Sequence, residues 1–175
     1  MSKSKKNTID PEEMIKMYGA DAVRWFILSD SPPDKDVQWS DSGVVSSNKF
    51  LQKLWNLNQI LINKKDNKGD VKLDENFSNT INLSIIKITD LINKFQLNVA
   101  IAQFYEIYKF LYDQINLNIS KKKYREGLVK IMKILIPFTP HLAYECLEQL
   151  NAQNLDKWPK LETNILKDTK VNIVI

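Results

Sequence analysis

Residues 81–115, INLSIIKITDLINKFQLNVAIAQFYEIYKFLYDQI, carry the clearest structural pattern in the chain. Apolar side chains recur there every three or four positions, in two sets separated by a short polar break near residues 96–98. The first set is Ile81, Ile85, Ile88, Ile92 and Phe95, and the second is Leu97, Ile101, Phe104, Tyr108, Leu111 and Ile115. Such spacing lines one face of an α-helix, and a short break favours antiparallel neighbours. The stretch therefore predicts two helices of an α-helical bundle.

The same spacing continues on both sides of this stretch. On the carboxyl side a third set predicts another helix, and its members are Tyr124, Leu128, Ile131 and Leu135. Pro137 and Pro140 bracket a break, after which a last helix runs from about His141 to Leu150. On the amino side, a longer helix follows the letters WSDSG and is succeeded by a polar connector at residues 63–70. The apolar face of that longer helix is made by Phe50, Leu54, Leu57 and Leu61, widened by Leu51, Trp55 and Ile62.

Two short helices are expected before the bundle. Asp10 can cap a helix that starts at Pro11, Glu13 completes a capping box, and Gly19 suits the end of that helix. A second helix covers about residues 21–28, before Pro32 and Pro33 force a loop.

The carboxyl end has a different pattern. In KVNIVI, residues 170–175, the apolar side chains of Val171, Ile173 and Ile175 alternate with the positions between them, which is typical of a β-strand. We interpret this segment as a truncated strand, because no partner strand is expected elsewhere in the chain. The fold class expected is thus all-α, an antiparallel helical bundle with a truncated strand at the carboxyl end.

Composition restricts the classes of function. The 175 residues carry a net charge of +4, which permits a polyanionic partner, and only Arg24 and Arg125 of the 25 basic residues are arginine. Cys146 and His141 are the only residues of their types, so an internal disulfide, a thiolate zinc site and a histidine-rich metal site are excluded. Because no apolar run approaches the ~20 residues that span a bilayer, and the single cysteine fits a reducing compartment, we expect a soluble intracellular protein with no membrane partner. We also expect it to be cytoplasmic and monomeric.

Several motifs then point to one family. The segments MSKSKKN at residues 1–7, DP at 10–11, YGAD at 18–21 and Arg24 follow one another at spacings specific to the Leu/Ile/Val/Met branch of class I aminoacyl-tRNA synthetases. The segment SPPDKDVQWSDSGV at residues 31–44 resembles the leucine-specific members, of bacterial or organellar type. Three further segments resemble the bundle helices of that family and the stretch by which the chain leaves the bundle, namely LNVAIAQFYEI, LIPFTPHLAYECLEQL and KWPKLE. The chain is identified as similar to leucyl-tRNA synthetases over its whole length.

The resemblance implies a division into three parts. Residues 1–40 would hold the signature loop and connecting helices at the end of a catalytic region. Residues 41–155 would form the anticodon-binding helical bundle, and residues 156–175 an exit linker and the first strand of a truncated domain. Because the nucleotide-binding domain and the editing domain of the family have no counterpart here, we expect the chain to be inactive alone.

The resemblance also implies a chemistry for the signature loop. In the family, leucine attacks the α-phosphate of ATP, with Mg²⁺ present, and negative charge grows on the departing phosphates. A well-placed ammonium stabilises that charge. Lys3 is the catalytic candidate, and the ATP-contacting residues would be Met1, Ser2, Lys3 and Ser4.

The tRNA contacts expected in the bundle come from lysines. Lys49 and Lys53 lie four residues apart, opposite the apolar face of their helix, and Lys121, Lys122 and Lys123 begin another helix. A run of this kind is usually a solvated helix start, but its positive charge opposes the helix dipole, and contact with a phosphate of tRNA(Leu) would compensate for that cost. Leucyl-tRNA synthetases, which the chain resembles, generally do not depend on reading the anticodon. We therefore expect the chain to bind tRNA through contacts with the tRNA backbone.

Other conspicuous residues favour structural roles. His141 lacks a serine or aspartate companion in sequence and suits a hydrogen bond near a helix start. Cys146 lies on an apolar helix face, which favours packing in the core. Asp21 and Arg24 are expected to fix the junction between the catalytic region and the helical bundle. Two functions remain open from sequence: part of a leucine–tRNA ligase that uses leucine, ATP and tRNA(Leu), or a free-standing helical module that binds tRNA or another partner without catalysis.

Overall fold

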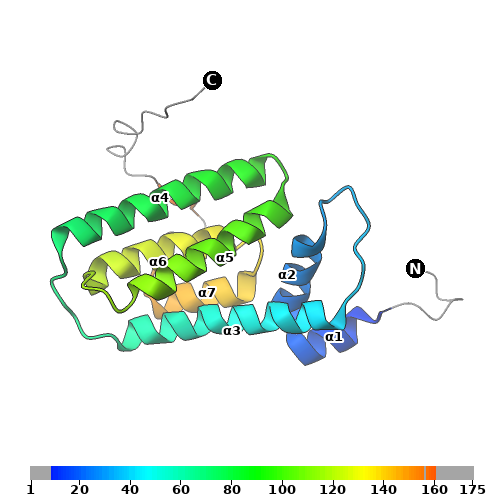
Figure 1. The fold of residues 1–175 in the computed structure, drawn as a ribbon. Coiled ribbons are helices and arrows are strands. Elements are labelled where there is room, and N and C mark those ends of the chain that lie inside the picture. Colours follow the sequence, from blue (N-terminus) through cyan, green and yellow to red (C-terminus); the bar gives the residue numbers. More distant parts are fainter. Residues whose placement is uncertain (1–8, 156, 161–175) are drawn as a thin grey trace, which may run out of the picture.

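The computed structural model describes residues 9–155 and 157–160, and this part of the chain is built from helices (Figure 1). The helices are α1 (Pro11–Tyr18), α2 (Ala20–Asp30), α3 (Asp41–Asn63), α4 (Val71–Asn93), α5 (Leu97–Gln114), α6 (Lys121–Leu135) and α7 (Pro140–Gln149). The expected all-α bundle is confirmed. The strand expected at residues 170–175 lies outside the described residues.

Polar side chains determine where several of these helices begin. Asp10 accepts a hydrogen bond from Glu12 N at 2.9 Å, so α1 starts where the sequence predicted. Ser40, Asp70 and Ser120 cap α3, α4 and α6 in the same way, each accepting from the backbone N–H three residues on. Each cap satisfies an N–H group that has no partner within its own helix.

The long helices pack side by side around one core (Figure 1). Helix α4 contacts α5 and α6, α3 contacts α6 and α7, and α2 lies across α3 and α5. The apolar faces predicted for α3, α5 and α6 are directed inward, with Leu54, Ile101 and Leu128 each at most 2% exposed. The packing of these stripes is what makes the helices stable, because isolated helices of this length are marginal in water.

Helix α4 starts where the predicted polar connector of residues 63–70 ends, and it departs from the expectation at its carboxyl end. It begins at Val71, ten residues before the first isoleucine of its predicted stripe, and Phe77 in that stretch is only 1% exposed. At the other end Leu91 is buried, whereas Phe95 is 63% exposed. The prediction for Phe95 was wrong because the helix has already ended. Phe95 adopts φ +58°, and Gln96 N donates to Leu91 O, which is the hydrogen-bond pattern of a helix C-terminus that usually holds glycine.

Candidate nucleic-acid interface

The first two predicted lysines lie on the exposed side of α3. Lys49 and Lys53 are both exposed, while Phe50, Leu54 and Leu57 between and beyond them are buried. The helix therefore carries both ammonium groups on one exposed face, and the buried side chains of the opposite face fix the helix in the bundle. Long lysine stems on such a helix leave the charged ends in solvent, where a phosphate can approach.

The three lysines at the start of α6 are not equivalent. Lys121 Nζ donates to Ile62 O at 3.1 Å, in the last turn of α3, and its side chain is 25% exposed. Lys123 pairs with Glu126 at 3.1 Å. Lys122 is exposed and makes no ion pair within the described residues. The cost of a positive charge at this helix start is thus offset at two of the three positions by protein groups.

The structure does not bring the two lysine groups together. Lys121 contacts α3 at Ile62, which is nine residues beyond Lys53, or about 14 Å along the helix axis. The first group therefore lies near the middle of α3, whereas the second lies beside its last turn.

Basic side chains at four places bind the carboxyl ends of neighbouring helices, and sequence reasoning missed this use. Lys121 does so for α3, and Lys64 Nζ donates to Ile115 O at 2.7 Å, just after α5. Arg24 Nη2 donates to Pro137 O at 2.7 Å after α6, and Arg125 Nε donates to Leu150 O at 2.8 Å after α7. The free carbonyls at a helix end carry partial negative charge, so these cations stabilise the corners of the bundle. Both arginines of the chain have structural partners.

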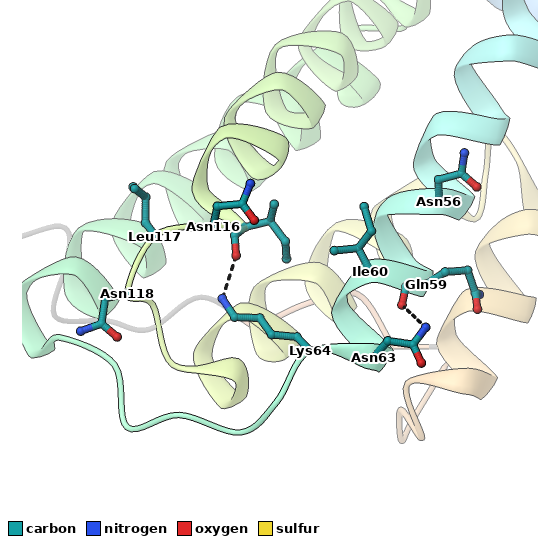
Figure 2. A pocket seen from close by; sticks show the side chains of 9 residues that line it. Asn56, Gln59, Ile60, Asn63, Lys64, Asn116, Leu117 and Asn118 are labelled. Carbon is teal, nitrogen blue, oxygen red and sulfur yellow. Dashed lines mark hydrogen bonds between the residues drawn. The ribbon is translucent and has the colours of Figure 1, made fainter.

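A groove lies between the end of α3 and the α5–α6 connection, and no sequence motif had indicated it (Figure 2). Its volume is about 950 Å³. Five of the nine lining side chains are amides, namely Asn56, Gln59, Asn63, Asn116 and Asn118. Ile60 and Leu117 add half-exposed apolar surface, and the Lys64 side chain spans the two walls (Figure 2). Burial lowers the pKa of Lys64 below the ordinary lysine value.

The α3–α4 connector and the first turn of α4 are fastened to the α5–α6 connection beside this groove. Asp74 accepts hydrogen bonds from both Ser120 N and Ser120 Oγ, at 2.8 and 2.6 Å. Asn67 Nδ2 donates to Ile119 O, and Gly69, at φ +71°, lies against the backbone of Ser120. A side chain at position 69 would put its Cβ 2.3 Å from Ser120 N, so only glycine fits there. The two connections form one rigid end of the bundle.

At the opposite side of the fold, α2 is bound to the α6–α7 corner. The Asp21 carboxylate accepts from Leu142 N at 2.8 Å and lies 2.9 Å from His141 Nδ1. It takes the place of a local cap, because Thr139 makes no side-chain cap at the start of α7. Arg24, three residues on, donates to the carbonyls of Pro137 and Phe138. The expected junction role of Asp21 and Arg24 and the structural role of His141 agree with these contacts.

The remaining predicted site residues, Met1, Ser2, Lys3 and Ser4, lie outside the described residues. Within residues 9–155 and 157–160 no cluster of three or more His, Cys, Asp or Glu side chains could hold a metal ion. None of the helices in that part is both long and apolar enough to cross a membrane. Cys146 is buried, as expected, and burial raises its pKa to about 12.

Two family models match the chain. The anticodon-binding domain of tRNA ligase matches residues 74–175, and the class I tRNA synthetases for isoleucine, leucine, methionine and valine match residues 1–40. The second match ends immediately before α3 begins at Asp41.

The chain is similar along its whole length to leucine–tRNA ligases of bacteria. It is 34% identical to that of Ehrlichia canis and 38% identical to that of Fervidobacterium nodosum, with the whole chain aligned in each case. It is 37% identical to that of Prochlorococcus marinus. The chain spans only 21–23% of the length of these curated relatives.

A solved structure shares the fold. The LeuRS of Agrobacterium radiobacter K84, in a ternary complex with tRNA and LeuAMS, superposes with a TM-score of 0.83 at 24% sequence identity. The superposition covers 95% of this chain and 23% of the other.

Proposed function

The chain belongs to the anticodon-binding domain family of tRNA ligases, and from this premise we propose that it serves leucine–tRNA ligation as the part that holds tRNA(Leu). The whole-length similarity to leucine–tRNA ligases is the observation that carries the proposal. The reaction would take place in the cytoplasm and would attach leucine to tRNA through leucyl-adenylate, at the expense of ATP.

We propose the same three parts as the sequence suggested. Residues 1–40 connect to catalysis, residues 41–155 form the tRNA-binding bundle, and residues 156–175 lead out of it. The family match over residues 1–40 supports the first boundary. In that first part Lys3 would stabilise the charge that develops on the phosphates of ATP, with Met1, Ser2 and Ser4 forming the rest of the loop. The described residues contain no carboxylate cluster suited to the Mg²⁺ that accompanies ATP, and we assign that ion no step.

In the bundle, the tRNA contacts would be made by Lys49, Lys53 and Lys122. All three are exposed, and α3 and α6 hold them from buried opposite faces. We give Lys121 and Lys123 a secondary part, because each already has a partner in the protein. Contacts of lysine ammonium groups with phosphates position an RNA without specifying its sequence.

The test is the salt dependence of tRNA binding. Binding of a tRNA(Leu) transcript by the chain should weaken steeply as salt rises, since each phosphate contact releases counterions. Replacing Lys49 and Lys53 by alanine should reduce the slope of log affinity against log salt by about 1 for each lysine. Lys87→Ala/Lys109→Ala is the matched control, because both of these lysines are exposed on other helices.

An unchanged slope in the Lys49→Ala/Lys53→Ala variant, or an equal loss in the control, would refute the assignment of α3. A preference for the leucine anticodon that survives high salt would contradict the backbone mode of contact.

A further inference from the structure

The amide-lined groove at the end of α3 continues the lysine face of that helix. Lys49, Lys53, Asn56, Ile60 and Asn63 are all exposed and follow one another at spacings of four, three, four and three residues. At 100° per residue this series stays within one narrow stripe. The distance along the axis from Lys53 to Ile60 is about 10 Å. An elongated ligand held on the two lysines and running along α3 therefore enters the groove.

The chemistry of the groove differs from that of the lysines. Its amides both donate and accept hydrogen bonds, whereas an ammonium only donates. The half-exposed side chains of Ile60 and Leu117 supply flat apolar contact, and none of the nine lining residues is acidic. The only charged lining group, Lys64, has its ammonium bonded to Ile115 O. The groove thus suits a neutral, polar part of a ligand that carries phosphates elsewhere.

Ribose and exposed base edges have this chemistry. The 2′-hydroxyl both donates and accepts, it lies in the shallow minor groove of an RNA helix, and it is the group that distinguishes RNA from DNA. Asparagine and glutamine side chains can pair with it and with base edges in the same way. Because the Lys64–Ile115 contact joins the two walls, the backbone that carries the amides is set before any ligand arrives.

We propose that this groove is a second RNA site, whose amides bind ribose hydroxyls of the RNA that Lys49 and Lys53 hold by its phosphates. The inference rests on the proposed function and adds a division of labour to it. The lysines supply affinity that depends on salt and is indifferent to the sugar. The groove supplies affinity that is independent of salt and requires ribose.

The decisive variant is Asn56→Ala/Asn63→Ala/Asn116→Ala. All three side chains are exposed and none bonds to another helix within the described residues, so the fold should persist. Three other exposed asparagines, all on α4 and outside the groove, provide the matched control Asn76→Ala/Asn79→Ala/Asn93→Ala. Dissociation constants are measured by fluorescence anisotropy at several salt concentrations, for a tRNA(Leu) transcript and for a DNA strand of the same sequence.

We expect the groove variant to bind the transcript roughly tenfold more weakly at every salt concentration, with the slope unchanged and the affinity for DNA unchanged. The control should match the unaltered chain. An undiminished affinity for the transcript would overturn the groove site while leaving the lysine contacts intact. Equal losses for RNA and DNA would overturn the recognition of ribose. If the unaltered chain showed no salt-dependent binding to the transcript, the proposed function itself would fail.

Discussion

Replacing Asp21 by alanine should destabilise the fold more than any other single change of a charged side chain at its junction. Asp21 is 7% exposed and binds the start of α7 from a helix 120 residues away in sequence. The variant leaves Leu142 N without its acceptor and removes the negative charge at a helix N-terminus.

The magnitude follows from these contacts. The hydrogen bond from Leu142 N to a carboxylate contributes about 1.5–3 kcal/mol, and the favourable interaction with the helix dipole adds about 0.5–1 kcal/mol. The contact with His141 adds little, because the His141 side chain is 77% exposed and solvent screens the interaction. The free energy of unfolding should therefore fall by about 2–4 kcal/mol. For a chain of this size that corresponds to a decrease in Tm of about 5–15 °C.

The assay is urea and thermal unfolding followed by circular dichroism at the helical band. Asp21→Asn keeps an acceptor for Leu142 N but loses the charge, so it should lose about half as much stability. His141→Ala should change the stability by less than about 1 kcal/mol. Asp34→Ala, in the exposed α2–α3 loop, is the control for a lost carboxylate. A loss below about 0.5 kcal/mol in Asp21→Ala, or an equal loss in His141→Ala, would show that Asp21 does not cap α7.

Three other changes test separate parts of the structure. Gly69→Ala should cost about 3 kcal/mol of unfolding free energy, because the residue has φ +71° and its Cβ would meet Ser120 N at 2.3 Å; a neutral result in urea unfolding would contradict the rigid end of the bundle. Phe95→Gly should raise the unfolding free energy by about 1 kcal/mol, since Phe95 is exposed and held at φ +58°. Asn151→Gly should raise it by less, and a larger gain for Asn151→Gly than for Phe95→Gly would refute the strain argument. The Cys146 thiol should resist alkylation in the folded chain at neutral pH. Because burial raises its pKa from 9.0 to about 12, the thiol should contribute a fall in unfolding free energy of about 1.4 kcal/mol per pH unit between pH 9 and 12, and the decline in Cys146→Ala should be shallower by that amount.

The candidate site was only partly predictable. Lys49 and Lys53 could be placed on an exposed face because the buried residues of α3 flank them at helical spacing. The lysines of α6 could not be told apart, since nothing local distinguishes Lys121, which reaches across to Ile62 O, from Lys122, which faces solvent. The groove was missed altogether, because its two walls are more than 50 residues apart in sequence and neither carries a motif.

The sequence by itself determined the helices, their order and the family. Apolar spacing, the caps at Asp10 and Gly19 and the proline breaks act over a few residues, so they can be recognised before any packing is known. Even so, Phe95 was misplaced, because the end of α4 depends on a backbone conformation that phenylalanine rarely adopts.

Only the tertiary structure decided which polar groups meet. Asp21 reaches the start of α7, Arg24 the end of α6 and Lys64 the end of α5 across 51 to 121 residues of chain. The pairing depends on how the helices cross and on which helix ends lack partners, and a periodic pattern carries no information about either. Packing therefore determined which basic side chains are engaged by the protein and which face solvent.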